Sequence, residues 1–248
     1  LVQKAAKADV VLFGEQHNNA VAHWLQLSLT KALHEKLGDS LVVGAEMFER
    51  DDQLTINEYL NGLIKTKHFE RRAKLWDNYE TDYKPVLEFA KSNELNFIAT
   101  NIPRRYANFV AYHSVEALDT FSREALQYMP PLPIPMNMDL PGYKRIRKMQ
   151  MHGGDAKYLA QAQAVKDAAM AKAIVDNRGA DQTFLHLNGN YHSNNFEGIY
   201  WYLNEYAEDL EVLTISTVSQ EAVKKLNEDH EGKADFIICT QADMTKTY

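Results

Sequence analysis

The feature that most constrains the fold of this 248-residue chain is a series of short apolar runs separated by longer segments of helical pattern. The runs are apolar on both sides of an extended chain, which is typical of buried parallel strands. We predict strands at 9–15, 40–48, 96–100, 182–189, 211–219 and 234–241, and helices between them at 20–37, 83–92 and 194–206. Strands and helices that alternate in this way form βαβ units. The predicted fold class is therefore α/β, with a largely parallel sheet flanked by helices.

The middle of the chain departs from this alternation. Between residues 104 and 177 no strand pattern is present, and the alanine-rich stretch 155–176 is an excellent helix former. The connection before it, 128–154, holds five of the seven prolines, a density that excludes regular helix. We therefore predict an α/β core over 1–103 and 178–248, with a helical insertion and its proline-rich connection at 104–177.

Composition narrows the possible classes of protein. The net charge of −7 argues against a general nucleic-acid-binding protein, and no apolar run approaches the length of a membrane span. The single cysteine, Cys239, excludes an intrachain disulfide and leaves the redox compartment open. The chain begins at Leu1 without an initiator methionine, so we interpret it as a processed or trimmed product and conclude nothing from the missing targeting segment.

Titratable side chains follow four of the predicted strands at their carboxyl ends, the edge at which open parallel sheets bind ligands. The candidate catalytic residues there are Glu15, His17, Glu46, Arg104 and His192. Glu15 and His17 are two positions apart and so project to the same side of a strand. His192 follows a Gly-Asn turn, a position that favours an exposed imidazole, whereas His186 inside a strand is interpreted as a satisfied core histidine.

These residues allow several interpretations. Two histidines with one or two carboxylates suit a divalent ion such as zinc, manganese or non-haem iron. They equally suit a metal-free hydrolase, in which a histidine held by a carboxylate deprotonates water. No Gly-x-Ser-x-Gly element accompanies them, which argues against a covalent mechanism. These residues could also have a structural role alone. In that case Glu15 and His17 form a hydrogen-bonded pair, and Glu46 forms an ion pair with Arg104 or Arg105.

Six segments of the sequence, taken in order, resemble one known family. They read "FGEQHNN", "GAEMFERDDQ", "WDNYETDYKPVLEFA", "IATNIPRRY", "QAVKDAAMA" and "LNGNYH". Together they resemble the ChaN-like haem-binding lipoproteins, in the superfamily of the Tiki proteases and the erythromycin-esterase-like proteins, over about residues 9–206. The resemblance implies an α/β core with a small helical subdomain and, in bacteria, haem or iron acquisition. Superfamily relatives hydrolyse substrates with an acid–histidine cluster, which matches Glu15, His17, Glu46 and His192.

The resemblance also implies a location and partners. We expect a periplasmic or outer-membrane lipoprotein of the bacterial cell envelope, attached to the membrane only through a lipid anchor outside this sequence. The expected partners are haem, a second copy of the chain when haem is bound, and haem transport components. The stretch "SNNFEGIYW" after His192 departs from the family, in which a Gly-x-Pro is expected, and leaves the shape of that loop open.

A haem site needs an axial ligand, an apolar surface and cations for the propionates, and the proline-rich connection contains all three. The candidate residues are Tyr143, His152, Arg145 and Arg147, with Lys144 and Lys148 as further cations and methionines 129, 136, 138, 149 and 151 as apolar surface. We predict Tyr143 as the iron ligand, because the Pro141-Gly142 turn should place its ring at the surface and nearby cations should lower the pKa of its phenol. His152 is the competing ligand. The interpretation without function is a mobile, solvated loop.

Three functions are therefore compatible with the sequence. We favour a haem-binding protein of a bacterial uptake system over an enzyme. The second is a hydrolase that uses the strand-end cluster, and the third is a binding or structural lipoprotein in which the cluster is a satisfied polar network.

Overall fold

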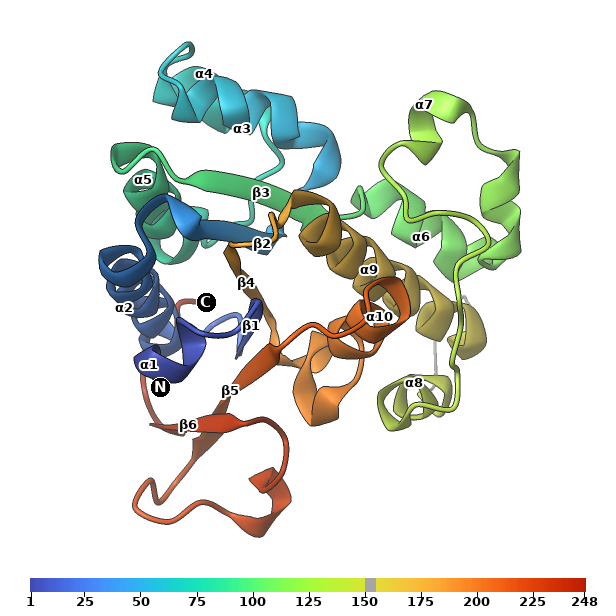
Figure 1. Ribbon diagram of the computed structural model, residues 1–248. Coiled ribbons are helices and arrows are strands. Elements are labelled where there is room, and N and C mark those ends of the chain that lie inside the picture. Colours follow the sequence, from blue (N-terminus) through green and yellow to red (C-terminus); the bar gives the residue numbers. More distant parts are fainter. Residues whose placement is uncertain (150–154) are drawn as a thin grey trace.

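The computed structural model describes residues 1–149 and 155–248. Within them, six strands form one sheet of order β3-β2-β4-β1-β5-β6, in which every neighbouring pair is parallel (Figure 1). The strands are β1 (Val10–Glu15), β2 (Leu41–Glu49), β3 (Asn96–Asn101), β4 (Thr183–Gly189), β5 (Val212–Gln220) and β6 (Phe236–Gln241). The predicted α/β class with a parallel sheet is confirmed.

Helices cover both faces of this sheet (Figure 1). On one side are α1 (Val2–Ala5), α2 (Ala20–Leu37), α3 (Gln53–Leu60), α4 (Thr66–Arg72) and α5 (Lys84–Ser92). On the other are α6 (Arg104–His113), α7 (Arg123–Leu126), α8 (Pro141–Arg147), α9 (Ala156–Asn177) and α10 (Ile199–Tyr206). None of the helices in the described part of the chain has the length and apolarity that crossing a membrane requires.

Each face of the sheet has its own hydrophobic core, because alternate residues of a strand project to opposite sides. Val11 and Phe13 of β1 belong to the core that includes Leu33 of α2. Their neighbours Val10 and Leu12 belong to the core on the other face, with α9 and α10. A strand that is covered on both sides needs apolar residues at every position, which explains the uninterrupted apolar runs in the sequence.

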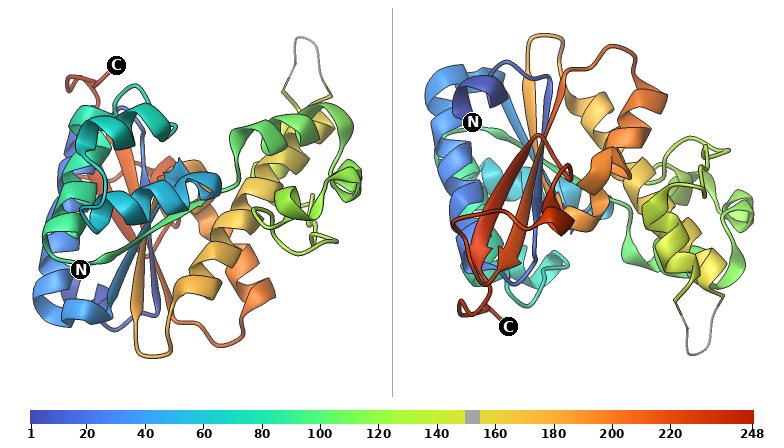
Figure 2. Two further views of the ribbon diagram at one scale, coloured as in Figure 1. Left: turned by 90° about the horizontal axis from the view of Figure 1, so that it is seen from above. Right: turned by 90° about the horizontal axis from the view of Figure 1, so that it is seen from below.

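Residues 104–177 contain α6 to α9 and, in their described part, no strand. Figure 2 shows α9 between the sheet and the green and yellow-green segments that extend to one side. α9 contacts β3 as well as α6, α8 and α10, and most of its buried positions are alanines, which allow close approach. The division into a core and an inserted unit stays a prediction.

The proline-rich connection contains a helix that the sequence analysis excluded. α8 begins at Pro141, and proline is tolerated in the first turn of a helix because its missing N–H has no acceptor there. The prediction that no regular helix forms in 128–154 is therefore wrong for Pro141–Arg147. His152 and Met151 lie outside the described residues.

Candidate active site

A cleft of about 510 Å³ lies at the carboxyl edge of the sheet. Four of its lining side chains come from successive strand ends: His17 after β1, Glu46 in β2, Arg104 after β3, and His192 after β4. Ile146 of α8 and Leu159 of α9 line the same cleft. The structure thus brings together most of the predicted strand-end residues and adds to them a wall from the predicted haem-binding connection.

Glu15 does not line the cleft but lies behind His17. Its Oε1 accepts hydrogen bonds from His17 Nδ1 (2.9 Å) and from the Tyr83 hydroxyl (2.8 Å). His23 Nδ1 lies 3.1 Å from Glu15 Oε2, and His23 Nε2 lies 3.2 Å from Asp82 Oδ2. Burial opposes the negative charge of Glu15, but the hydrogen bonds and charges of the two histidines outweigh it and lower the pKa of Glu15.

His17 lines the cleft and is held through one ring nitrogen, Nδ1. The other, Nε2, lies close to Gly189, because a Cβ atom built at that position would be only 2.6 Å from it; the glycine therefore lets the ring approach the backbone closely. The side chain is 33% exposed, and Nε2 makes no hydrogen bond with a described residue. Burial lowers the pKa of His17, but the hydrogen bond to Glu15 and the charge of Glu46 raise it, and the net effect is a raised pKa. His17 Nε2 is thus free to accept a proton or bind a ligand.

His192, in contrast, is engaged through both ring nitrogens. Nε2 lies 3.1 Å from Glu46 Oε1, and Nδ1 forms a hydrogen bond with Asp167 Oδ1. Glu46 Oε2 also accepts from the backbone N–H of Gly189 (2.7 Å), and the Tyr143 hydroxyl donates to Asp167 Oδ2 (2.6 Å). The prediction of an exposed imidazole is wrong, because the two buried carboxylates draw the ring inward and leave His192 only 4% exposed.

The charges of this buried group follow from its geometry. Burial would lower the pKa of His192, but Glu46 and Asp167 raise it to about 10. At Glu46, burial raises the pKa, but the contact with His192 outweighs it, and the net effect is a lowered pKa. At Asp167, burial and the negative charge of Glu46 outweigh the contact with His192 and raise the pKa. At neutral pH His192 is therefore an imidazolium without a lone pair for a metal or a proton.

A divalent metal at this cluster is not supported. Within residues 1–149 and 155–248, no three His, Cys, Asp or Glu side chains form a group that can hold a metal ion. The physical reason is that Glu46 and His192, two of the predicted ligands, already satisfy each other. The proposed ion pair of Glu46 with Arg104 or Arg105 is also wrong, since Glu46 pairs with His192 and Arg105 pairs with Asp51.

Tyr143 lies in the interior, so the prediction that its ring is at the surface is wrong. The residue is 2% exposed because α8 turns it toward Asp167 of α9. Burial and the charge of Asp167 raise the pKa of the phenol, opposite to the expected direction. Arg145 and Arg147 are exposed on α8, and their contact with propionates stays a prediction. Of the described methionines in the connection, only Met149, at 53%, is strongly exposed.

Three residues that hold the cluster in place were not predicted from the sequence: His23, Asp82 and Asp167. Asp167 carried a signal, because it is an acidic residue within the alanine-rich stretch of a buried helix and needs a partner there. His23 lies on α2, six residues after His17, and its ring contacts become visible only in three dimensions. Asp82 belongs to a π-helical turn, Tyr79–Tyr83, a geometry that the local sequence did not indicate.

A six-stranded parallel sheet with an acid–histidine cluster at its carboxyl edge defines the structural class of this protein. The chain belongs to the family described as haem-binding uptake, Tiki superfamily, ChaN, whose model matches residues 1–203. No curated protein matches the chain significantly.

Solved structures show the same fold. ChaN of Campylobacter jejuni, described by its cofacial heme binding, is 16% identical with a TM-score of 0.68, covering 95% of this chain and 89% of that chain. The type III effector HopBA1 is 15% identical with a TM-score of 0.53 and coverages of 97% and 91%. A mutant of the erythromycin esterase EreC in its open conformation is 16% identical with a TM-score of 0.52 and coverages of 88% and 72%.

Two of the buried histidines, His186 and His192, should differ in charge at neutral pH. His186 is a satisfied core residue, 2.8 Å from the Thr100 hydroxyl and 3.1 Å from Asn188 Oδ1, and burial lowers its pKa to about 4. We expect imidazole NMR shifts to show His192 protonated up to at least pH 8, because its pKa is raised to about 10, and His186 neutral down to about pH 5. A His192 resonance that titrates near pH 6.5 would contradict the buried ion contact.

Proposed function

We propose that this chain is a haem-binding protein of a bacterial haem or iron uptake system, located in the cell envelope. The observation that carries the proposal is the match of a haem-binding family model to most of the chain. We place haem at the strand-end cleft and the neighbouring surface of α8. Four residues of the strand-end set, His17, Glu46, Arg104 and His192, line this cleft together with Met149 of the predicted haem-binding connection.

The cleft fits the general needs of haem, which supplies the iron chemistry when bound. Its volume is within the range of ligand pockets, about 300–1,000 Å³. Apolar walls come from Trp76, Ile102, Ile146 and Leu159, and cations from Arg104 and Lys166 within the cleft. Arg145 and Arg147 add exposed cations on α8, the helix that forms one wall.

Among the described histidines that line the cleft, only His17 has a ring nitrogen without a hydrogen-bond partner, Nε2. A histidine that donates Nδ1–H to a carboxylate is held in the tautomer and orientation of a metal-binding imidazole. Tyr191, at the cleft, donates its hydroxyl to the carbonyl oxygen of Gly142 (2.6 Å). Ligation by Tyr143 stays a prediction and requires its phenol to leave Asp167. His152, the competing ligand, lies outside the described residues.

Hemin titration tests the proposal directly. We expect a saturable Soret band and, at saturation, the mass of a homodimer by light scattering. The reason for dimerisation is that a haem in an open cleft exposes an apolar face, which a second copy can cover. The cofacial binding reported for the C. jejuni protein supports this arrangement. Absence of a saturable change in the Soret band of hemin would contradict haem binding, and a monomer at saturating hemin would contradict the dimer alone.

The substitution Tyr143→Phe tests whether the phenol of Tyr143 stabilises the fold or binds the haem iron. Because the hydroxyl donates to buried Asp167, we expect the variant to lose about 1–3 kcal/mol in the free energy of unfolding while its ferric haem spectrum is unchanged. Urea denaturation and the hemin spectrum measure the two effects. Loss of a ferric tyrosinate spectrum in Tyr143→Phe, with His152→Ala unchanged, would assign the iron to Tyr143.

The free nitrogen of His17 also favours a second candidate, a metal-free hydrolase. His17 Nε2 can take a proton from water while Glu15 stabilises the imidazolium through Nδ1. We expect hydrolysis of an activated ester to rise with pH, since a base with a raised pKa is active only in its neutral form, above that pKa. The activity should be lost in His17→Ala and kept in a control variant of exposed His113. Equal rates in both variants would exclude this candidate.

A further inference from the structure

We propose that Arg104 and Lys166 form a carboxylate-binding site in the cleft, which selects flat, largely apolar ligands that carry an acidic group. The inference deepens the proposed function, because a porphyrin with two propionates is such a ligand. It does not depend on iron, since any apolar carboxylic acid of suitable size presents the same chemistry.

The cations that line the cleft outnumber the acidic side chains that could neutralise them. The carboxylate of Glu46 is satisfied by His192 and by the N–H of Gly189, and Glu49 pairs with Lys74 at 2.8 Å. The acidic groups that line the cleft are thus already neutralised. In the described part of the chain, neither Arg104 nor Lys166 forms an ion pair or a side-chain hydrogen bond. The cleft therefore has two cations in excess, and an entering anion finds no competing carboxylate on them.

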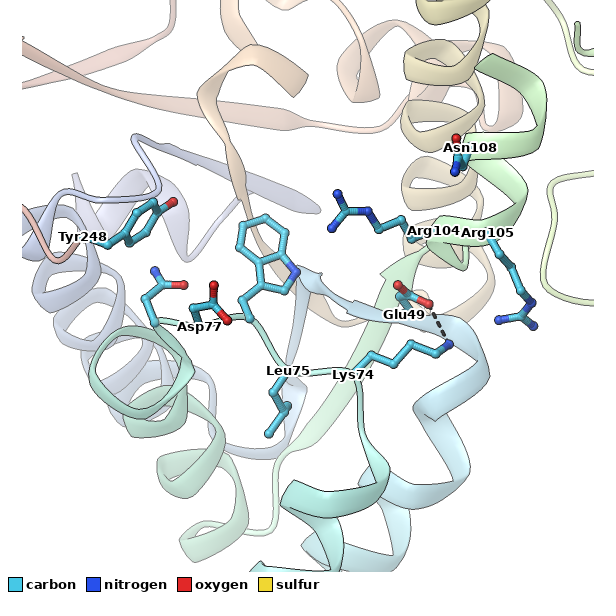
Figure 3. A pocket seen from close by; sticks show the side chains of 10 residues that line it. Glu49, Lys74, Leu75, Asp77, Arg104, Arg105, Asn108 and Tyr248 are labelled. Atoms are coloured by element: carbon cyan, nitrogen blue, oxygen red, sulfur yellow. Dashed lines mark hydrogen bonds and ion pairs between the residues drawn. The ribbon is translucent and has the colours of Figure 1, made fainter. Parts of the chain in front are cut away.

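The side chain of Arg104 differs from that of its neighbour Arg105 in direction and in partners. Arg104 and Arg105 are neighbours at the start of α6 and both line a hollow next to the cleft, where Figure 3 shows their side chains extending in different directions. Of the two, only Arg104 also lines the cleft. Arg105 binds Asp51 and donates to the Tyr106 hydroxyl (3.1 Å). Arg104 is exposed and keeps all its donors for a ligand. A guanidinium can bind a carboxylate through two parallel hydrogen bonds, which gives geometric specificity as well as attraction.

An aromatic ring and open space adjoin Arg104. Arg104 and Trp76 line both the cleft and a neighbouring hollow of about 740 Å³, so the two spaces meet at these side chains. The half-buried Trp76 ring is fixed edge-on by His17, with ring centroids 4.9 Å apart, and by Tyr83 at 5.8 Å. A rigid indole next to an unpaired guanidinium suits a flat apolar body with an acidic end. Asp77 lines the neighbouring hollow but not the cleft. Its negative charge therefore disfavours acidic ligands in the hollow and not in the cleft.

Fluorescence titration with 1-pyrenebutyrate and its neutral analogue 1-pyrenebutanol tests the site without iron. We expect the wild-type protein to bind the acid, and Arg104→Ala or Lys166→Ala to weaken that binding about tenfold or more, because each removes charge-assisted hydrogen bonds. We expect the wild type to bind the alcohol more weakly than the acid, and both substitutions to leave the affinity for the alcohol unchanged. Arg105→Ala is the matched control, from the adjacent position of the same helix, and should bind the acid as the wild type does.

Titration of the same variants with iron-free protoporphyrin IX and with hemin shows whether the site binds the propionates of a porphyrin or only other apolar carboxylic acids. A loss in Arg104→Ala for protoporphyrin as well as for pyrenebutyrate supports a site that accepts porphyrin propionates. If hemin binds equally well to the wild type, Arg104→Ala and Lys166→Ala, the inference is wrong and the proposed function stands. If the acid binds through Arg104 and hemin does not bind, the inference stands and the proposed function fails. If the folded wild type binds neither 1-pyrenebutyrate nor protoporphyrin IX, the inference is wrong.

Discussion

The interaction on which the cleft depends is the buried contact of one imidazolium, His192, with two carboxylates, Glu46 and Asp167. It joins β2, the turn after β4 and α9, three elements that are distant in the sequence. Loss of one member of such a contact costs about 3–5 kcal/mol, because the remaining charge stays buried without a partner. The pKa of His192 is raised above its unfolded value to about 10, so its contribution to stability is complete below about pH 6.5 and is lost as the pH rises through 10.

His17 also contacts a buried carboxylate, that of Glu15, but unlike His192 it keeps one ring nitrogen without a partner among the described residues. Glu15 binds His17 on one nitrogen only, and the other nitrogen lies next to Gly189, which has no Cβ atom to contact it. His192 is thus a fixed positive charge, whereas His17 keeps a donor atom free. Through Tyr143 and Asp167 the buried network also reaches α8, whose Ile146 forms a wall of the cleft. The strand-end cluster and the α8 wall are therefore parts of one site.

Much of the fold could be predicted from the sequence because both faces of the sheet are covered. The apolar runs located all six strands to within two residues at each end, and carboxyl-end positions identified His17, Glu46 and His192. The orientation of single side chains could not be predicted in this way. Tyr143 follows a Pro-Gly pair that usually marks a surface turn, but here Pro141 starts a helix, and this helix turns the phenol inward. That orientation depends on Asp167, a partner 24 residues away in the chain.

The central claim is that haem binds at the cleft between the strand ends, α8 and α9. Anomalous scattering at the iron absorption edge from crystals grown with hemin tests it most directly, because the iron position follows without any assumption about the ligand. The account predicts an iron peak within the cleft lined by His17, Arg104 and Ile146. An ordered iron peak outside this cleft would contradict it.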